Sequence, residues 1–361
     1  MRSYLDHNAT SPLRPAVKAA MLAAMEVEGN ASSVHREGRA ARKLLDDSRE
    51  VIARGIGVIT PMISFTSGGS EANNLAIKGA PVERILVSAI EHPSVIEAAK
   101  AVPRPAEFIP VTPDGIVDLE ALAKMLEGPK ALVSVMLANN ETGVIQPLRE
   151  IVALAQSKGA LVHTDAVQAF GKVPVNFGLL GVDMMSLSAH KVGGPAGVGA
   201  LVVRDGLVLE PLIHGGGQEL RRRAGTENLL GIAGFAAVAK EDLLDVSVLR
   251  GQLETALEGA VIFGGNAPRL PNTTYFSMPG MSAETLLMNF DLEGVAVSSG
   301  SACSSGKVAK SHVLTAMAVA PNLARGAVRI SLGWNTTSEH IEHFITVWRK
   351  LLARHKARAA A

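Results

Sequence analysis

A lysine stands where an apolar stretch of the chain gives way to a polar, glycine-rich turn. Lys191 follows the apolar residues 182–187, within the run Ser188-Ala-His190-Lys191, and two glycines come after Val192. A lysine amine at the carboxyl end of a buried strand can form an imine with an aldehyde cofactor, provided that partial desolvation lowers its pKa. The hydroxyl and imidazole groups before it could bind a phosphate. Alone, the pattern fits a surface lysine at a strand end equally well.

An acidic residue occupies the equivalent place after another apolar stretch. Asp165 comes at the end of residues 160–164, and Gln168 follows three positions later. A carboxylate at the end of a buried strand is costly unless a partner neutralises it. A protonated pyridine nitrogen is such a partner, and the pair of an aspartate with a pyridinium recurs among pyridoxal-phosphate enzymes.

Three further strand ends carry small or polar residues. Gly69 and Ser70 lie in a turn that opens a helix, where backbone N–H groups and the helix dipole favour a phosphate, although an ordinary capped turn would look the same. His92 could stack on a flat ring, or it could simply end a loop. Asn140 offers polar groups to a substrate or to a ring oxygen.

The chain contains one cysteine, Cys303, in a segment of serines and glycines. A single cysteine excludes an internal disulfide and an all-cysteine metal site, and it favours a reducing cytoplasm as the compartment. Most cysteines are buried and inert, but this composition predicts an exposed, mobile thiol. Such a thiol favours a nucleophile.

The elements that must position these residues follow from the hydrophobic pattern. Between residues 62 and 203, apolar stretches alternate with helical periodicity, which predicts an α/β fold with a largely parallel sheet and helices on both faces. In open sheets of this kind, ligands bind beyond the carboxyl ends of the strands. The predicted strands are 63–66, 84–88, 131–137, 160–164, 183–187 and 199–203, and the predicted helices are 15–28, 36–56, 71–78, 94–101, 119–127 and 148–157.

After about Asp245 the pattern changes to short strands at 273–277, 296–298 and 327–331, mixed with helices, which predicts a smaller α+β domain. The last helix has an apolar stripe between residues 341 and 352, and Thr336 with Glu339 suggests a capping box at its start. His340 and His343 are interpreted as part of a solvated face, because no third metal ligand is near them in the sequence.

Composition excludes several classes of protein. The 361 residues are 47% hydrophobic and 19% charged, and the net charge of +1 gives no reason to expect nucleic-acid or membrane binding. We expect no membrane-spanning segment and no signal peptide. The segment 300–307 differs from a P-loop in its spacing, and no dinucleotide-binding glycine motif follows the first strand.

Each of these signals is weak alone, but together they place five functional groups at one edge of one sheet. A lysine, an acid and phosphate-binding residues at such an edge predict pyridoxal 5'-phosphate as the cofactor and no metal.

The same residues closely resemble those of the cysteine desulfurases, in the group that contains NifS and IscS, over nearly the whole chain. The segments that carry the resemblance are Tyr4 to Thr10, Phe65 to Glu71, Glu91-His92, Asn139 to Gly143, His163 to Gln168, Ser188 to Lys191, Arg222 to Asn228, Ser298 to Cys303, and Arg329 to Gly333. Two positions depart from the family pattern, Ala31 and Ala196, and neither touches the proposed chemistry.

The resemblance implies the pyridoxal-phosphate-dependent transferase fold of type I, like that of aspartate aminotransferase, in a homodimer. It implies a large cofactor-binding domain over residues 13–245 and a small α+β domain made of residues 1–12 and 246–361, which carries the Cys303 segment.

The resemblance also assigns roles to the residues. Lys191 would bind the cofactor covalently, Asp165 would keep the ring nitrogen protonated and Gln168 would contact the ring hydroxyl. His92 would stack on the ring and assist proton transfer as a catalytic residue. Arg329 would bind the substrate carboxylate through two hydrogen bonds, assisted by Asn140. The phosphate ligands would be Gly69, Ser70, Ser188, His190 and, from the partner subunit, Thr226.

The implied reaction removes sulfur from L-cysteine. Lys191 would move the α-proton, the Cys303 thiolate would attack the substrate sulfur, and alanine would leave a persulfide on Cys303 for an acceptor protein, for iron–sulfur clusters or other sulfur-containing molecules. Two alternatives stay open. A small-substrate aminotransferase explains Lys191 and Asp165 but gives Cys303 no task, and an inactive scaffold for sulfur transfer predicts the loss of the lysine or the acid.

Overall fold

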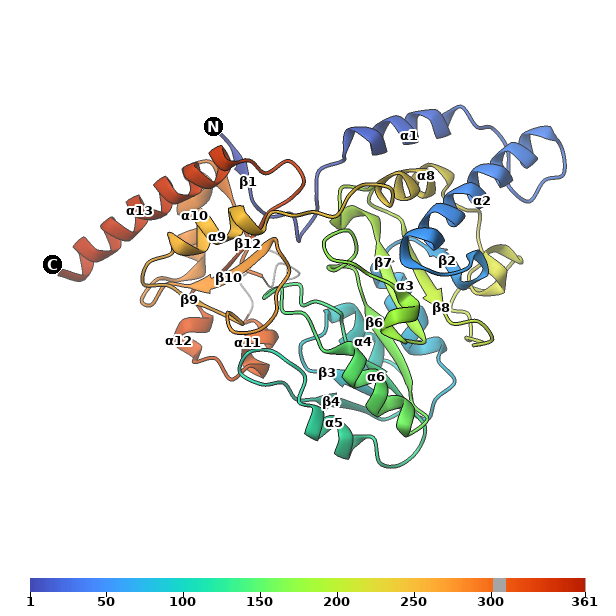
Figure 1. Ribbon diagram of the computed structural model, residues 1–361, viewed down its shortest axis with the longest axis horizontal. Helices are drawn as coiled ribbons and strands as arrows, with labels where there is room; N and C mark the ends of the chain where they lie inside the picture. The colour runs from blue at the N-terminus through green and yellow to red at the C-terminus, as the bar shows by residue number, and fades with distance from the viewer. Residues whose placement is uncertain (301–309, 361) are drawn as a thin grey trace.

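The computed structural model describes residues 1–300 and 310–360. Cys303, the nucleophile expected from the sequence, lies outside the described residues. The described chain is mainly α/β, with a large sheet in its first two thirds and smaller sheets in its last third (Figure 1).

The large sheet has seven strands in the order β2-β8-β7-β6-β5-β3-β4. β8 runs antiparallel to both of its neighbours, and the other pairings in the sheet are parallel. The predicted strands are all present: β2, β3 and β8 have the predicted ends, and the ends of β5, β6 and β7 differ by one to three residues. β4 at the sheet edge was not predicted. The strands are β2 (Ile63–Thr66), β3 (Arg84–Ser88), β4 (Ala106–Ile109), β5 (Ala131–Ser134), β6 (Leu161–Asp165), β7 (Met184–Ser188) and β8 (Gly199–Val203).

Helices cover both faces of this sheet, because consecutive strand residues point to opposite faces and both faces are apolar. Val133 of β5 belongs to the core formed with α2, α6 and α8, whereas Leu132 belongs to the core formed with α3 and α4. The helices of this part are α1 (Pro15–Met25), α2 (Arg36–Ile56), α3 (Gly69–Gly79), α4 (Pro93–Lys100), α5 (Leu119–Met125), α6 (Leu148–Ser157), α7 (Phe177–Leu180) and α8 (Leu229–Val238), with 3-10 turns at η1 (Thr60–Met62), η2 (Ala189–Lys191) and η3 (Gln218–Arg221).

The C-terminal part packs around its own aromatic core. Phe290 stacks on Phe344, and Phe276 meets the edge of Trp348. The elements of this part are α9 (Ser247–Thr255), β9 (Val261–Ile262), β10 (Thr273–Ser277), α10 (Ala283–Leu292), β11 (Val295–Ala296), α11 (His312–Ala316), α12 (Pro321–Ala324), β12 (Ala327–Ser331) and α13 (Ser338–Ala360).

The N-terminal segment joins the two parts. β1 (Ser3–Tyr4) pairs in parallel with β11, and the chain then crosses to the large sheet, where α1 begins (Figure 1). Leu5 belongs to the C-terminal core, whereas Val17 belongs to the core of the large sheet. These separate cores support a division into residues 13–245 and residues 1–12 with 246–361, which stays a prediction.

The start of α13 differs from the capping box expected at Thr336. The helix begins at Ser338, so Thr337 precedes it, and the Thr337 N–H donates to the Nδ1 atom of His340. Thr336 instead accepts a hydrogen bond from the Gly333 N–H. His340 and His343 are both half-buried and His343 bonds to the Ser3 hydroxyl, so the face that was expected to be solvated is only partly exposed.

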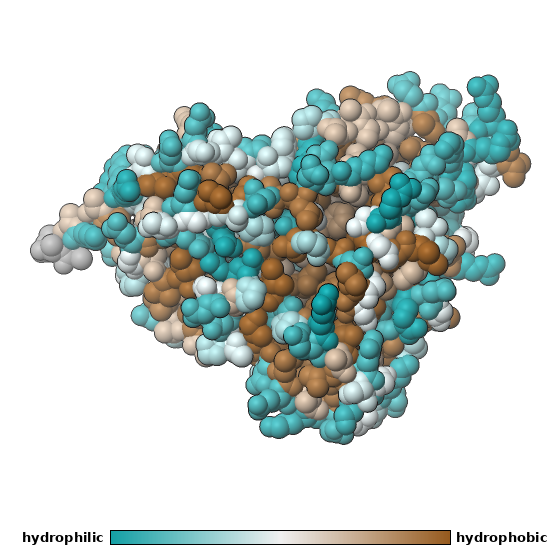
Figure 2. All heavy atoms as spheres, in the orientation of Figure 1, coloured by the Kyte–Doolittle hydropathy of each residue, from teal (hydrophilic) through white to brown (hydrophobic). Residues whose placement is uncertain are grey.

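Hydrophobic residues gather in the middle of the face shown in Figure 2, between the C-terminal part and the large sheet, with charged residues around them. Within residues 1–300 and 310–360, no helix is both long and apolar enough to span a bilayer. The same residues contain no cluster of three or more histidine, cysteine, aspartate or glutamate side chains suited to a metal ion.

Candidate active site

A cavity of about 240 Å³ lies beyond the carboxyl ends of the central parallel strands. Strands β7, β6, β5 and β3 are consecutive in the sheet, so the loops that follow them meet at one edge. Residues predicted from the sequence make up most of the cavity wall: Gly69, Ser70, His92, Asn140, Asp165, Gln168, Ser188, His190 and Lys191. The prediction that these residues meet at one edge is therefore confirmed.

Asp165 lies at the end of β6 and is almost completely buried, with 5% of its surface exposed. One carboxylate oxygen accepts a hydrogen bond of 2.7 Å from the Asn73 side chain, and the other accepts one of 2.9 Å from the Val167 N–H. No lysine or arginine in the described part of the chain forms an ion pair with it. A buried carboxylate held only by neutral donors is suited to a cationic ring nitrogen.

His92 caps the start of α4 and faces the same cavity. Its Nδ1 atom accepts the Ser94 N–H, so the neutral ring carries its proton on Nε2. Burial lowers the pKa of His92, and Lys191 lowers it further, whereas Asp165 opposes the shift. His92 is therefore a neutral, flat ring at neutral pH, which suits stacking.

Asn73 and Ser94 were missed by the sequence reasoning. The Asn73 amide donates both to Asp165 and to the Ser94 hydroxyl, so it links the buried acid to the residue that orients His92. Asn73 lies about one helical turn after Ser70, on the helix predicted to open with a phosphate site, and that spacing was an available signal.

The other end of the cavity has the features of an anion site. α3 begins at Gly69, where an added Cβ would lie 2.8 Å from a methyl group of Val167, so a side chain would collide with the cavity wall. The Ser188 hydroxyl is buried and has no hydrogen-bond partner within the described residues. The His190 pKa falls to about 4, mainly through burial, so this imidazole is neutral.

Lys191 ends η2, the turn that follows β7. Its Nζ atom donates to the Asn8 carbonyl oxygen at 2.7 Å and to the Ala9 carbonyl oxygen at 2.9 Å. These carbonyl groups belong to the N-terminal segment, whose proximity to Lys191 was not predicted. Two backbone oxygens therefore help to hold the lysine amine at the cavity.

Arg329 borders the cavity wall without lining it. One of its terminal nitrogens donates to the Asn140 carbonyl oxygen at 2.9 Å, and the other pairs with Asp6 at 2.8 Å. Its side chain is 3% exposed. The Asn140 side-chain oxygen, on the cavity wall, has no partner in the described part of the chain. The structure thus brings together Arg329 and Asn140, the two residues predicted to bind a carboxylate.

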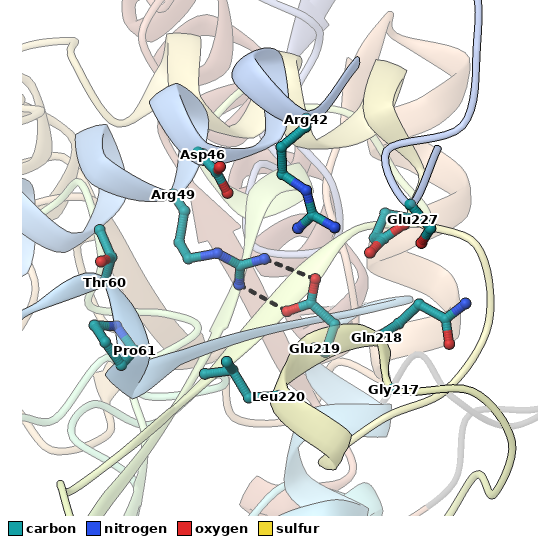
Figure 3. Close-up of a pocket in the computed structure, with 11 residues that line it drawn as sticks. Arg42, Asp46, Arg49, Thr60, Pro61, Gly217, Gln218, Glu219, Leu220 and Glu227 are labelled. Carbon is teal, nitrogen blue, oxygen red and sulfur yellow. Dashed lines mark hydrogen bonds and ion pairs between the residues drawn. The ribbon is translucent and has the colours of Figure 1, made fainter. Parts of the chain in front are cut away.

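Thr226 lies away from this cavity, on the exposed surface of the chain, and its role as a phosphate ligand in a partner subunit stays a prediction. A second cavity of about 510 Å³, beside its segment, is shown in Figure 3. There Arg49 of α2 forms two hydrogen bonds with Glu219, at 2.7 and 2.8 Å, and Glu219 also accepts the Phe65 N–H. Glu219, Leu220 and Arg221 all have left-handed backbone angles, so this ion pair holds a strained segment in place.

The residues of the first cavity fit pyridoxal phosphate. The buried Asp165 suits its ring nitrogen, the helix start with the unpartnered Ser188 hydroxyl suits its phosphate, and the Lys191 amine suits its aldehyde. Cys303 cannot be placed in this geometry, because it lies outside the described residues.

Comparison with known proteins agrees with this reading. The aminotransferase class-V family matches residues 3–344. The chain is similar to the cysteine desulfurase IscS of Dictyoglomus turgidum, with 41% identity over 97% of this chain and 94% of that protein. The structure of a NifS-like protein from Rickettsia africae shares 38% identity at a TM-score of 0.89, covering 98% of this chain and 100% of that one. A structure described as SspA in complex with cysteine shares 31% identity at a TM-score of 0.83, covering 91% of this chain and 98% of that one.

Proposed function

The chain belongs to the aminotransferase class-V family, and from this premise we propose that it is a pyridoxal-phosphate-dependent cysteine desulfurase. The observation that carries the proposal is one cavity in which Lys191 and Asp165 lie with four of the predicted phosphate ligands, Gly69, Ser70, Ser188 and His190. The similarity to a chain whose structure contains cysteine supports L-cysteine as the substrate.

Bound pyridoxal phosphate would supply an aldehyde that joins amines and a ring that accepts electrons from the substrate α-carbon. Asp165 would hold a proton on the ring nitrogen, since it is buried and lacks another cationic partner in the described chain. Ser188, His190 and the start of α3 would bind the phosphate, with Thr226 of the partner subunit as a further ligand. The neutral His92 ring would cover one side of the cofactor.

Substrate binding would depend on the positive charge of Arg329, which borders the cavity at Asn140. Arg329 would bind the carboxylate of L-cysteine, with the Asn140 side chain as a second contact. The Lys191 amine, displaced from the cofactor by the substrate amine, would then carry the α-proton. Its position near the Asn8 and Ala9 carbonyl oxygens would keep it beside the reacting carbon.

Sulfur removal requires a second nucleophile, and Cys303 stays our prediction for it. Its thiolate would attack the substrate sulfur. The carbon–sulfur bond of the substrate would break, a sulfur–sulfur bond would form on Cys303, and the carbon skeleton would take up protons and leave as alanine. The persulfide would pass to an acceptor protein, for iron–sulfur cluster assembly or another sulfur-containing product. We place this homodimeric enzyme in the cytoplasm.

The test is the product balance from L-cysteine. We expect alanine and, with a reductant, sulfide in equal amounts, and we expect borohydride to fix the cofactor on Lys191. Release of a keto acid without alanine would point to an aminotransferase, and a colourless protein that borohydride leaves unlabelled would point to a scaffold. Persulfide transfer that survives Cys303→Ala would contradict the role of that cysteine. Lys158→Ala, at an exposed lysine, is the control.

A further inference from the structure

From the contacts around Gln168 we infer that Lys172 is a positioning residue for the reaction: it orients the Gln168 amide so that an N–H group, and not an oxygen, faces the cofactor. The inference rests on the proposed function, because it names the group that Gln168 would meet. Lys172 was not singled out by the sequence analysis.

Lys172 is buried beneath the cavity, with 4% of its surface exposed. Its Nζ atom donates to the Gln168 side-chain oxygen at 2.7 Å and to the Asn8 side-chain oxygen at 2.8 Å. Gln168 lies on the cavity wall, and Lys172 does not. Lys172 can therefore act on a bound cofactor only through its neighbours.

The donor set allows one orientation of the Gln168 amide. The Lys172 Nζ atom has hydrogens to donate whether the amine is charged or neutral, and it donates to Gln168, so the amide group that faces it is the carbonyl oxygen. The amide nitrogen then donates one hydrogen to the Asn8 carbonyl oxygen at 3.0 Å, which leaves its second hydrogen for the cavity. The reverse orientation would turn the amide oxygen toward the Asn8 carbonyl oxygen, which cannot donate, and would leave buried groups unsatisfied. Gln168 thus presents a donor, which matches a negatively charged ring oxygen.

The surroundings of Lys172 explain why a purely structural role is a poor account of it. No carboxylate pairs with Lys172 among the residues that the structure describes. Burial lowers its pKa well below the usual range, and Lys191 and Arg329 lower it further. Lys172 in turn contributes to the low pKa values of His7 and His190, each about 4. A buried lysine among other basic groups is costly to the fold, and an apolar side chain would avoid that cost.

The test uses the holoenzyme and the visible absorbance of its bound cofactor. We measure the midpoint pH of the absorbance change, which reports how tightly Lys191 Nζ holds its proton in the loaded enzyme. In Lys172→Met, Gln168 loses its fixed donor orientation, so the ring oxygen retains more negative charge and holds that proton more tightly. We expect the midpoint to rise by about one pH unit, the size expected for one hydrogen bond.

A double-mutant comparison separates orientation from charge. Gln168→Met should raise the midpoint on its own, and adding Lys172→Met to it should change little more, because the lysine acts through the glutamine. Lys158→Met, at a surface lysine, should leave the midpoint unchanged. The inference would be overturned if Lys172→Met had the same midpoint as the wild type. It would also be overturned if the shift in the double variant were the sum of the shifts in Lys172→Met and Gln168→Met.

A second variant and a control on the wild-type protein complete the test of Lys172. If Lys172→Met does not fold, Lys172→Gln places beside Gln168 a group that can accept as well as donate, so the orientation of the Gln168 amide is less fixed. We then expect a smaller shift in the same direction, and no shift would again overturn the inference. A wild-type protein that shows no visible band and no borohydride-fixed cofactor would overturn the proposed function itself. A normal wild-type band with unshifted variants would overturn only the role of Lys172.

Discussion

Arg329 reaches across to Asp6 of the N-terminal segment, with a terminal nitrogen 2.8 Å from the carboxylate. The arginine side chain is 3% exposed and the aspartate side chain 20% exposed, so the pair is largely shielded from water. A substrate carboxylate bound by Arg329 would share the guanidinium with Asp6. The negative charge of Asp6 would therefore weaken substrate binding while it keeps the arginine in place.

Replacing Asp6 by Asn tests whether Asp6 chiefly competes with the substrate for Arg329 or chiefly keeps Arg329 in place. We expect Asp6→Asn to lower KM for L-cysteine several-fold with little change in kcat, because Arg329 no longer shares its charge. The free energy of unfolding should fall by about 2 kcal/mol, the usual loss for a hydrogen bond to a charged group. Steady-state kinetics and urea unfolding measure both, and a raised KM would show that Asp6 chiefly orients the arginine.

Asp165→Asn should keep the fold and lose the reaction. The asparagine oxygen can still accept one of the hydrogen bonds that Asn73 and Val167 donate, but it cannot balance a charged ring nitrogen. We expect alanine formation to slow by at least about 100-fold, as for other buried electrostatic contacts to a reacting group. The cofactor should remain bound, which absorbance shows. Near-normal turnover would remove Asp165 from the chemistry.

The buried ion pair of Arg49 with Glu219 should be a strong contributor to stability. Glu219→Gln leaves Arg49 largely buried without a countercharge, so we expect a loss of about 3 kcal/mol in the free energy of unfolding. The control is Glu50→Gln, which breaks the exposed pair of Glu50 with Arg54 on the same helix and should cost less than about 0.5 kcal/mol. Equal losses in the two variants would contradict the prediction.

Acidification should destabilise the protein through His163. Burial lowers the pKa of this histidine to about 3, while its two ring nitrogens bond to the Ser134 and Ser186 hydroxyls. The unfolded chain takes up a proton near pH 6.5 and the folded chain does not, so stability is present above that pH and is lost as the pH falls toward 3.

Between pH 7 and pH 5 this residue alone should cost about 2 kcal/mol of the free energy of unfolding. Urea titrations at the two pH values measure the change. In His163→Gln the difference between the two pH values should shrink by about that amount. An unchanged difference would show that His163 does not cause it.

The fold and most of the cavity were predictable from local patterns. Apart from β4, each parallel strand is an apolar stretch. Asp165 and Ser188 end two of these strands and Lys191 follows Ser188 by three residues, so strand direction alone brings them to one edge. β4 was missed because it is a four-residue edge strand with exposed side chains at Glu107 and Phe108.

Contacts between distant segments were not predictable in the same way. Asn8 is 164 residues from Lys172 in the chain, and no spacing in the sequence indicates that their side chains meet. Lys172 was missed although it lies four residues after Gln168, because the segment between them follows no periodic pattern. The roles assigned to Thr226 and Cys303 stay predictions.

The N-terminal segment connects the proposed carboxylate-binding residue, Arg329, with the two lysines of the site. Asp6 pairs with Arg329, and two residues later the Asn8 carbonyl receives the Lys191 amine while its side chain receives Lys172. A substrate that displaced Asp6 from Arg329 would therefore shift the segment from Asp6 to Asn8. This segment also accepts the hydrogen bond from the Lys191 amine. Binding of a carboxylate at Arg329 would in this way change the surroundings of the Lys191 amine.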